Sequence, residues 1–222
     1  HIDKNIQYVI IITNMNNLDL TTPRVIFLVG IPGAGKTFFA SRFSEEFGAP
    51  FIDLEKIRHT VFENPVYSGD EQHRIEKLAA NQFTELLKTK RTIIYEGGLE
   101  TRSSRVRLAR QAREAGYRPL IVWVQTEQAT AHYRATRGSR NSKQSYTITN
   151  ERFTQLVNQF TVPNYLEKFI VISGKHTYPQ QAKTVLRSLV DLQKTTSKIQ
   201  TAKPTITVPE RVKPQVKRIS LQ

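Results

Sequence analysis

The octapeptide GIPGAGKT at residues 30–37 constrains the fold of this chain more than any other feature. It matches the pattern G-x-x-x-x-G-K-[ST], with an apolar run at Val25–Val29 before it and an amphipathic pattern at Lys36–Phe47 after it. Glycines at this spacing let a strand-to-helix turn wrap with its N–H groups pointing inward, where the helix dipole also favours anions. The motif therefore predicts a loop that binds the phosphates of a nucleotide.

Two side chains of this loop have specific expected roles. Lys36 should reach the β- and γ-phosphates of ATP, and Thr37 should ligate Mg²⁺. The guanine-reading pattern N-K-x-D of GTPases does not occur in the sequence. The loop residues expected to contact the nucleotide are Gly30, Gly33, Ala34, Gly35, Lys36, Thr37 and Phe38.

Short apolar runs alternate with amphipathic stretches along residues 23–192, which we expect to form one domain. The expected strands are Arg24–Val29, Pro50–Asp53, Thr92–Tyr95, Leu120–Val124 and Phe169–Ile172. The expected helices are Lys36–Phe47, Leu54–Phe62, Asp70–Lys88, Arg102–Ala115, Glu127–Arg137, Asn150–Gln159 and Gln180–Leu192, with Asn150 as an N-cap and Gly116 as a C-terminal cap. This alternation predicts an α/β fold with helices on both faces of a parallel sheet.

The two ends of the chain differ from this domain. The first residue is His1 and the only methionine is Met15, so we expect residues 1–14 to lie upstream of the natural start; a processed precursor is the alternative. Residues 1–22 are interpreted as an N-terminal extension. Residues 193–222 are rich in Lys, Thr, Gln and Pro and poor in aromatic residues, which predicts a disordered basic tail. Such a tail either tethers a polyanion or is a solvated terminus.

Charge and cysteine content narrow the possible functions. The 33 Lys and Arg residues exceed the 19 Asp and Glu residues, for a formal net charge of +14. This excess favours a polyanionic partner such as a nucleic acid, a nucleotide or a nucleotide sugar, while a basic surface without a specific partner is the alternative. The absence of cysteine excludes disulfides and thiolate chemistry. No apolar run is long enough to span a membrane and no secretory signal is visible, so we expect a cytoplasmic protein. We also expect a monomer or a weak dimer.

Candidates for a phosphoryl-acceptor site follow the second and third expected strands. Glu55 and Arg58 share a face of the expected helix, where a carboxylate could take the proton of an attacking hydroxyl and an arginine could clamp a phosphate of the acceptor. An ordinary surface ion pair is the alternative, and Asp53 could be the base instead of Glu55. Glu96 ends a strand, where open α/β sheets bind ligands, and could hold a magnesium-bound water or the acceptor.

Three arginines, Arg134, Arg137 and Arg140, form a basic segment near residues 134–140. Closing such a segment over the phosphates would neutralise charge in the transition state and exclude water. A basic helix end that is favoured by the helix dipole is the alternative.

Together these motifs resemble the P-loop kinase group that contains phage polynucleotide kinase, the zeta toxins and chloramphenicol phosphotransferase. The resemblance covers about residues 24–192. It implies a P-loop NTPase fold, a three-layer α/β/α arrangement with a five-stranded parallel sheet, the P-loop strand in the middle, and a helical lid. It also implies transfer of the γ-phosphate of ATP to a hydroxyl group.

The resemblance assigns roles to single residues. Glu55 stands where the group has its general-base aspartate, Arg58 matches the acceptor-binding arginine, and Arg134 and Arg137 match the lid. Arg105 falls near an arginine of the helix after the third strand and is expected at the acceptor. The motif after that strand appears as Glu96-Gly97-Gly98, and Phe160–Glu167 matches a final F-x-x-P-x-x-x-E segment. The expected catalytic residues are Lys36, Arg137 and either Glu55 or Asp53.

We therefore expect an ATP- and Mg²⁺-dependent kinase that acts on a nucleic-acid 5′ end, a nucleotide or a related small molecule. One alternative is a zeta-toxin-like kinase of a nucleotide sugar. The other is a nucleotide-dependent nucleic-acid-binding protein with weak catalysis, which the replacement of two aspartates of the group by Glu55 and Glu96 motivates.

Overall fold

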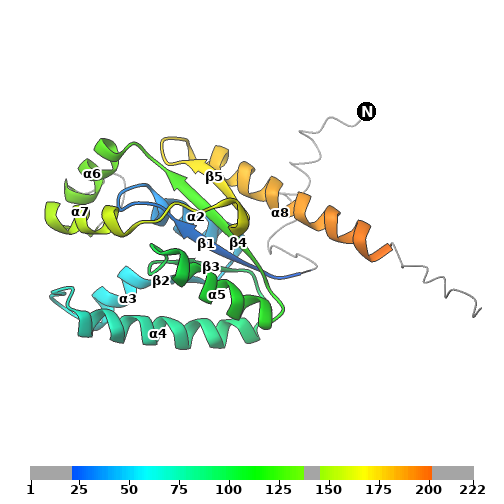
Figure 1. Cartoon of the computed structure of the whole chain (residues 1–222), viewed down its shortest axis with the longest axis horizontal. Helices are drawn as coiled ribbons and strands as arrows, with labels where there is room; N and C mark the ends of the chain where they lie inside the picture. Colours follow the sequence, from blue (N-terminus) through cyan, green and yellow to red (C-terminus); the bar gives the residue numbers. More distant parts are fainter. Residues whose placement is uncertain (1–21, 138–145, 202–222) are drawn as a thin grey trace, which may run out of the picture.

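The computed structural model of the protein describes residues 22–137 and 146–201, with side chains up to residue 190 (Figure 1). Five strands form one sheet in the order β2-β3-β1-β4-β5, and each neighbouring pair is parallel. This confirms the predicted five-stranded parallel sheet with the P-loop strand at its centre. The strands are β1 (Arg24–Val29), β2 (Phe51–Asp53), β3 (Ile93–Glu96), β4 (Arg118–Gln125) and β5 (Phe169–Ser173).

The helices of the described residues lie close to their predicted positions. Their observed ends lie within two residues of the predicted ends, except for the C-terminal end of the last helix. They are α2 (Lys36–Phe47), α3 (Leu54–Val61), α4 (Gly69–Lys88), α5 (Arg102–Glu114), α6 (Gln128–Arg137), α7 (Asn150–Gln159), the 3-10 helix η1 (Tyr165–Glu167) and α8 (Tyr178–Thr201).

Side chains on alternate positions of the sheet build two separate cores. On β1, Val25 and Phe27 pack with residues of α4 and α5, whereas Ile26 and Leu28 pack with residues of α2 and α8. All four are buried, as expected for a central parallel strand that is covered on both faces. Figure 1 shows α4 and α5 together along one face of the sheet. The predicted three-layer arrangement is therefore confirmed.

One of the two predicted helix caps is correct. Gly116 has φ 80° and its N–H donates to the carbonyl of Arg113, while Tyr117 N–H donates to that of Ala112, which ends α5 in a Schellman motif. The N-cap of α7, however, is Thr149 and not Asn150, because the Thr149 side chain accepts the hydrogen bond from the N–H of Arg152. Asn150 is already inside the helix.

Helix α8 continues past the predicted end at Leu192, nine residues further, to Thr201, the last residue that the structure describes. The prediction followed the loss of apolar residues, but no glycine or proline interrupts the sequence before Pro204, so nothing in the local chemistry breaks the helix. The prediction of a disordered tail is therefore wrong for residues 193–201, which are helical, and the rest of the predicted tail, residues 202–222, lies outside the described part. No helix among the described residues is long and apolar enough to cross a lipid bilayer.

The carboxyl ends of the strands meet at one edge of the sheet, because all five strands run in the same direction. The P-loop follows β1 there, Asp53 ends β2, and Glu96 ends β3. Helices α6 and α7 pack together beside this edge through Ala131 and Phe153. The edge is therefore where separate segments can combine into a site.

Candidate active site

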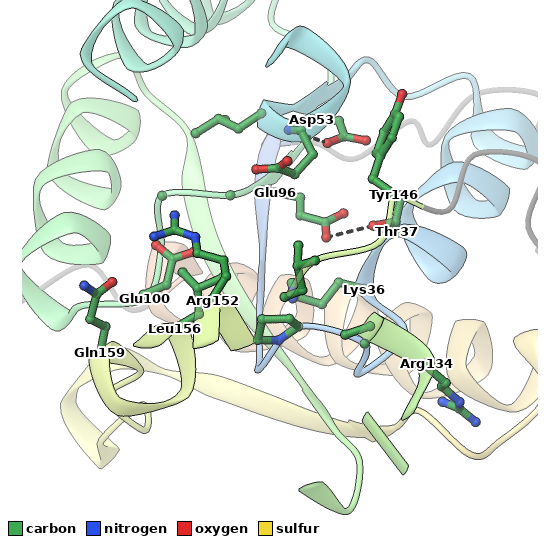
Figure 2. Close-up of a pocket in the computed structure, with 18 of the residues that line it drawn as sticks. Lys36, Thr37, Asp53, Glu96, Glu100, Arg134, Tyr146, Arg152, Leu156 and Gln159 are labelled. Atoms are coloured by element: carbon green, nitrogen blue, oxygen red, sulfur yellow. Dashed lines mark hydrogen bonds between the residues drawn. The ribbon is translucent and has the colours of Figure 1, made fainter. Parts of the chain in front are cut away.

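A cavity of about 1220 Å³ opens at this edge (Figure 2). Its walls come from the P-loop, from the segments after β2 and β3, from the start of α4, and from α6 and α7. Gly30 and Ala34 support the loop without lining the cavity, and Arg105 does not line it either. The predicted site residues that do line it are Gly33, Gly35, Lys36, Thr37, Phe38, Asp53, Glu55, Arg58, Glu96, Arg134 and Arg137.

The P-loop lies so close to its neighbours that glycine is required at two positions. Gly30 has φ 145° and Gly33 has φ 75°. A Cβ atom at Gly30 would lie 2.5 Å from the carbonyl oxygen of Val124, and one at Gly33 would lie 2.0 Å from that of Ala131. Any larger residue would push the loop away from β4 or from α6.

Lys36 closes the loop from within. Its Nζ donates to the carbonyl oxygens of Gly30 at 2.9 Å and Ile31 at 3.1 Å. An ammonium group has three donors, so one is left for another oxygen. Helix α2 begins at Lys36 without a side-chain cap, which leaves the N–H groups of its first turn available to an anion.

Thr37 and Glu96 could hold a divalent cation. The hydroxyl of Thr37 donates to Oε1 of Glu96 at 2.9 Å, and Oε2 of Glu96 is buried without a hydrogen-bond partner (Figure 2). Burial raises the pKa of Glu96 to about 7, while Lys36 opposes the rise. In the described part of the chain, no group of three or more His, Cys, Asp or Glu side chains is placed to hold a metal alone. The pair fits Mg²⁺, which usually combines few protein ligands with nucleotide phosphates and waters.

Asp53 connects β2 to α3. Its Oδ1 accepts hydrogen bonds from the N–H groups of Glu55 at 3.0 Å and Lys56 at 3.1 Å, so Asp53 is the N-cap of the helix. The side chain is buried next to Glu96, its neighbour in the sheet register. Burial raises the pKa of Asp53, and the two backbone hydrogen bonds oppose this rise.

Glu55 and Arg58 share a face of α3, as predicted, and belong to a larger network. Arg58 is buried; its Nε lies 3.4 Å from Oε1 of Glu55, and its Nη2 donates to Gln72. Oε2 of Glu55 accepts a hydrogen bond from the Tyr67 hydroxyl at 3.2 Å. The side chain of Glu55 is still 45 % exposed, so its carboxylate is accessible from the cavity. Because Arg58 is buried, the alternative of an ordinary surface ion pair does not apply.

Helix α6 brings both predicted lid arginines to the cavity. Nη1 of Arg134 donates to the carbonyl of Gly174, just after β5, at 3.0 Å. The guanidinium of Arg137 lies 5.5 Å from the ring centre of Tyr133. Arg140, the third arginine of the predicted segment, lies outside the described residues.

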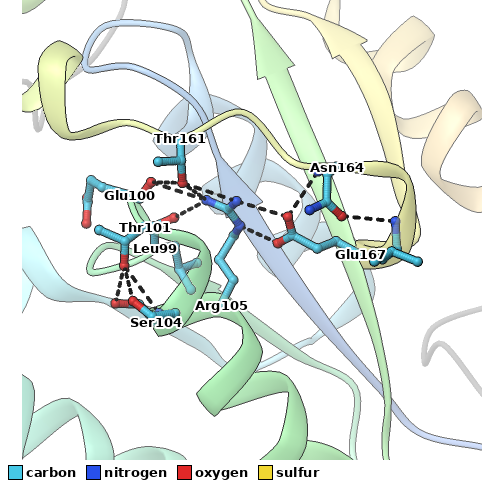
Figure 3. Close-up of polar contacts among 10 residues, drawn as sticks. Leu99, Glu100, Thr101, Ser104, Arg105, Thr161, Asn164 and Glu167 are labelled. Atoms are coloured by element: carbon cyan, nitrogen blue, oxygen red, sulfur yellow. Dashed lines mark hydrogen bonds and ion pairs between the residues drawn. The ribbon is translucent and has the colours of Figure 1, made fainter.

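Arg105 does not line the cavity, against the expectation that it contacts the acceptor. Figure 3 shows its guanidinium among hydrogen-bond partners inside the protein. Its Nε and Nη2 donate to the two carboxylate oxygens of Glu167 at 2.7 and 3.1 Å, and its Nη1 donates to the carbonyls of Leu99 and Glu100. Only 1 % of Arg105 is exposed. The N–H donors of Arg105 are used inside the protein, where they connect α5 to η1. The prediction that Arg105 contacts the acceptor is therefore wrong.

Sequence analysis missed several residues of the cavity wall. Arg152 and Gln155 share a face of α7, which their spacing indicates, but the sequence does not show what this face meets. Tyr67 precedes α4 in an irregular loop, where no periodic pattern signals a position. The missed wall residues include Tyr67, Gln72, Tyr133, Tyr146, Arg152, Gln155, Gln159, Gly174, Lys175 and His176.

The glycine-rich loop after the central strand, the strand order and the acidic residues at the neighbouring strand ends define a P-loop kinase. Residues 25–163 match the model of the AAA domain family AAA_33, and the chain belongs to this family. No curated protein shows detectable sequence similarity to the chain.

Several solved structures, kinases among them, have the same fold. A gluconokinase from Sinorhizobium meliloti 1021 superposes with a TM-score of 0.55 at 15 % identity, over 82 % of this chain and 99 % of that chain. The APS kinase CysC of Mycobacterium tuberculosis, in complex with AMPPNP and APS, gives 0.53 at 17 % identity, over 77 % and 98 %. A chain of the Pnkp1/Rnl/Hen1 RNA repair complex gives 0.51 at 20 % identity, over 65 % and 46 %. At such identities the likeness establishes the fold.

Replacing Arg105 by alanine would remove the counter-ion of Glu167, whose side chain is 5 % exposed, and leave its carboxylate only the hydrogen bond from the N–H of Asn164. We expect the free energy of unfolding to fall by about 3–5 kcal/mol, as for other broken buried ion pairs. Urea denaturation measures this change. The matched control is Arg110→Ala, because Arg110 is 74 % exposed and lies 3.8 Å from Glu114, so its loss should change little. Equal effects of the two variants would contradict a structural role for Arg105.

Replacing Glu96 by glutamine should stabilise the nucleotide-free protein at neutral pH. Because its folded pKa of about 7 lies above the unfolded value, the folded state binds the extra proton, and wild-type stability falls as pH rises from about 4.5 to 7. Glutamine does not titrate and can still accept the hydrogen bond of Thr37. Urea titrations in EDTA should show similar stabilities of variant and wild type at pH 4 and an advantage of more than about 1 kcal/mol for the variant at pH 8. The same difference at both pH values would show that the carboxyl is not perturbed.

Proposed function

We propose that this protein is a kinase that transfers the γ-phosphate of ATP to a hydroxyl of a nucleic-acid 5′ end, a nucleotide or a related small molecule. The supporting observation is that one cavity contains the P-loop on one side and the carboxylates of Asp53 and Glu55 on the other. A nucleotide hydrolase needs space only for a water beside the γ-phosphate. A cavity of about 1220 Å³ has room for a second substrate.

On the nucleotide side, main-chain groups supply most of the binding. The N–H groups of the loop and of the first turn of α2 receive the triphosphate. We assign the remaining donor of Lys36 to the oxygens of the β- and γ-phosphates, where it stabilises the charge of the transition state. Arg134 and Arg137 approach the same phosphates from α6, and Arg137 neutralises the transferring group. Phe38 lines the cavity beside the loop, and we place it next to the nucleotide.

We assign the hydroxyl of Thr37 and the unpaired Oε2 of Glu96 to Mg²⁺. When bound, the cation would neutralise charge on the β- and γ-phosphates. Glu96 must be deprotonated for this role. Its raised pKa predicts that, without cation and nucleotide, the carboxyl loses its proton only near or above pH 7. Binding of the cation favours the deprotonated form.

On the acceptor side, we assign Glu55 as the general base. Its carboxylate takes the proton of the acceptor hydroxyl while that oxygen forms a bond to the γ-phosphorus and the bond to the bridging oxygen breaks, which releases ADP. Tyr67 and Arg58 hold this carboxylate in place. Asp53 is less suited to the role, because it is buried and its Oδ1 caps α3. We assign Arg58 to the acceptor as well, since its Nη1 lacks a hydrogen-bond partner.

The similar structures agree with this reaction class. They include a gluconokinase, an APS kinase with AMPPNP and APS bound, and a chain of an RNA repair complex. Such a fold therefore serves acceptors of several kinds, and we retain the cytoplasm as the expected location of an ATP-dependent kinase.

Lys36→Ala should lower kcat by at least about a hundredfold, because a charge contact to the transition state is worth about 3 kcal/mol or more. The value of kcat is measured as the transfer of label from γ-labelled ATP to an acceptor. The acceptors tested are an oligonucleotide with a 5′-hydroxyl, a nucleoside, a nucleotide and gluconate. Lys88→Ala is the control, since Lys88 is 67 % exposed and outside the cavity. Label recovered only as inorganic phosphate with every acceptor would contradict the kinase assignment.

Separate amide variants identify the base. Glu55→Gln should lower kcat by about a hundredfold or more, as expected for loss of a general base, and Asp53→Asn by less than about tenfold. Asparagine also caps helices well, so Asp53→Asn should leave stability nearly unchanged. The reverse order of the two kcat values would transfer the role to Asp53.

A further inference from the structure

Helix α5 carries a stripe of exposed arginines outside the cavity. Its members follow one another at spacings of four, four and three residues and are Arg102, Val106, Arg110 and Arg113, all exposed. This spacing places them on one face of the helix. With a rise of 1.5 Å per residue, the stripe extends over roughly 16 Å along the helix axis.

Little negative charge balances this stripe. Glu114 lies 3.8 Å from Nε of Arg110, but both side chains are more than 70 % exposed, so the pair contributes little. Neither Arg102 nor Arg113 forms a salt bridge within the part of the chain that the structure describes. Like charges on one helix face repel each other, so a polyanion that neutralises the stripe would remove an unfavourable interaction.

The segment between α7 and β5 lies beside the first half of α5 (Figure 3). The N–H of Thr161 donates to the carbonyl of Glu100 at 2.8 Å, and Arg105 donates to both carboxylate oxygens of Glu167. Burial acts to raise the pKa of Glu167, but hydrogen bonds and the positive charges of Arg105 and Arg102 lower it below its usual value. Arg102, the first residue of the stripe, is therefore close to this segment.

This segment holds an aromatic ring in solvent on a fixed backbone. Tyr165 is 87 % exposed, and its neighbour Leu166 is 64 % exposed. The turn η1 that carries them is closed by a capping box between Asn164 and Glu167. Since Arg105 also holds Glu167, the buried ion pair sets the position of Tyr165. A ring presented in this way can stack on a flat partner at little cost in conformational entropy.

Both segments start at the wall of the cavity. Thr101 and Ser104 line it at the beginning of α5, and Gln159 lines it at the end of α7. Figure 2 shows Glu100 and Gln159 on the same side of the cavity, away from Arg134. The arginine stripe and η1 therefore form a surface that continues outward from this wall.

We propose that the exposed face of α5 and the ring of Tyr165 form a surface that binds single-stranded nucleic acid outside the cavity. The arginines of the stripe bind backbone phosphates, and Tyr165 stacks on an unpaired base. A single strand is the expected ligand, because base pairing in a duplex leaves the faces of the bases stacked on each other. Binding to this surface does not require phosphate transfer, so the inference stands apart from the proposed function.

Fluorescence anisotropy tests the contribution of the arginines. A labelled oligothymidylate of about twelve nucleotides is titrated with the full chain in EDTA, without ATP, at several salt concentrations. Each phosphate neutralised on a single strand contributes about −0.7 to the slope of log K against log salt concentration. Arg110→Gln/Arg113→Gln should therefore make the slope shallower by about 1.4 and weaken binding at about 0.05 M salt by more than about tenfold.

The matched control is Lys183→Gln/Arg187→Gln. It replaces two exposed cations of α8, which covers the other face of the sheet, and changes the net charge by the same amount. Its affinity and its salt slope should stay close to those of the wild type. Circular dichroism checks the fold of each variant.

A second pair of variants tests stacking. Tyr165→Ala should weaken binding by about fivefold to a hundredfold, the effect of losing one stacked base, without changing the salt slope. Tyr165→Phe keeps the ring and should bind like the wild type. Because Tyr165 is exposed, neither change should affect folding.

Four results would overturn the inference. The two double variants lose affinity equally, or Tyr165→Ala binds like the wild type. Polyglutamate of equal charge competes as well as unlabelled oligothymidylate, which would indicate an acidic protein partner. A duplex of the same length binds more tightly than the single strand. Failure of the proposed function differs from all of these, because then no acceptor receives label from ATP while the oligothymidylate still binds.

Discussion

The common direction of the five strands is the constraint on which the rest of this structure depends. Because every strand ends at the same edge, the P-loop, Asp53 and Glu96 are neighbours there although long stretches of chain separate them. The edge is closely packed: Gly30 touches β4 and Gly33 touches α6 so tightly that a single Cβ atom would not fit. The position of the loop is therefore set by the sheet and by the helix that covers it.

The site retains unfavourable electrostatics that its ligands would relieve. Oε2 of Glu96, Nη1 of Arg58 and Nε of Arg152 are buried without hydrogen-bond partners. Burial also raises the pKa of Glu96 and of Asp53, because charge is costly away from water. Such groups reduce the stability of the ligand-free protein, and at functional sites they indicate where cations and anions bind.

Two buried arginines show how the same side chain serves different purposes. Arg105 uses its donors on Glu167 and on backbone carbonyls, so it holds α5 against η1 and has none to offer a substrate. Arg58 is as deeply buried, yet one of its nitrogens lacks a hydrogen-bond partner and it lines the cavity. Sequence patterns place both on helices after strands, and only the partners of their guanidinium groups separate a structural role from a binding one.

The sequence alone determined the elements, the fold class and the P-loop. These depend on local chemistry: apolar runs, helix periodicity, and glycines that a strand-to-helix turn needs, which is why β1, α2 and α7 have their predicted bounds. The tertiary structure decided that Arg105 pairs with Glu167 and that Tyr67 and Arg152 join Arg58 in the cavity wall. Contacts between distant segments depend on how helices pack across the sheet edge, and no periodic pattern within a segment carries that information.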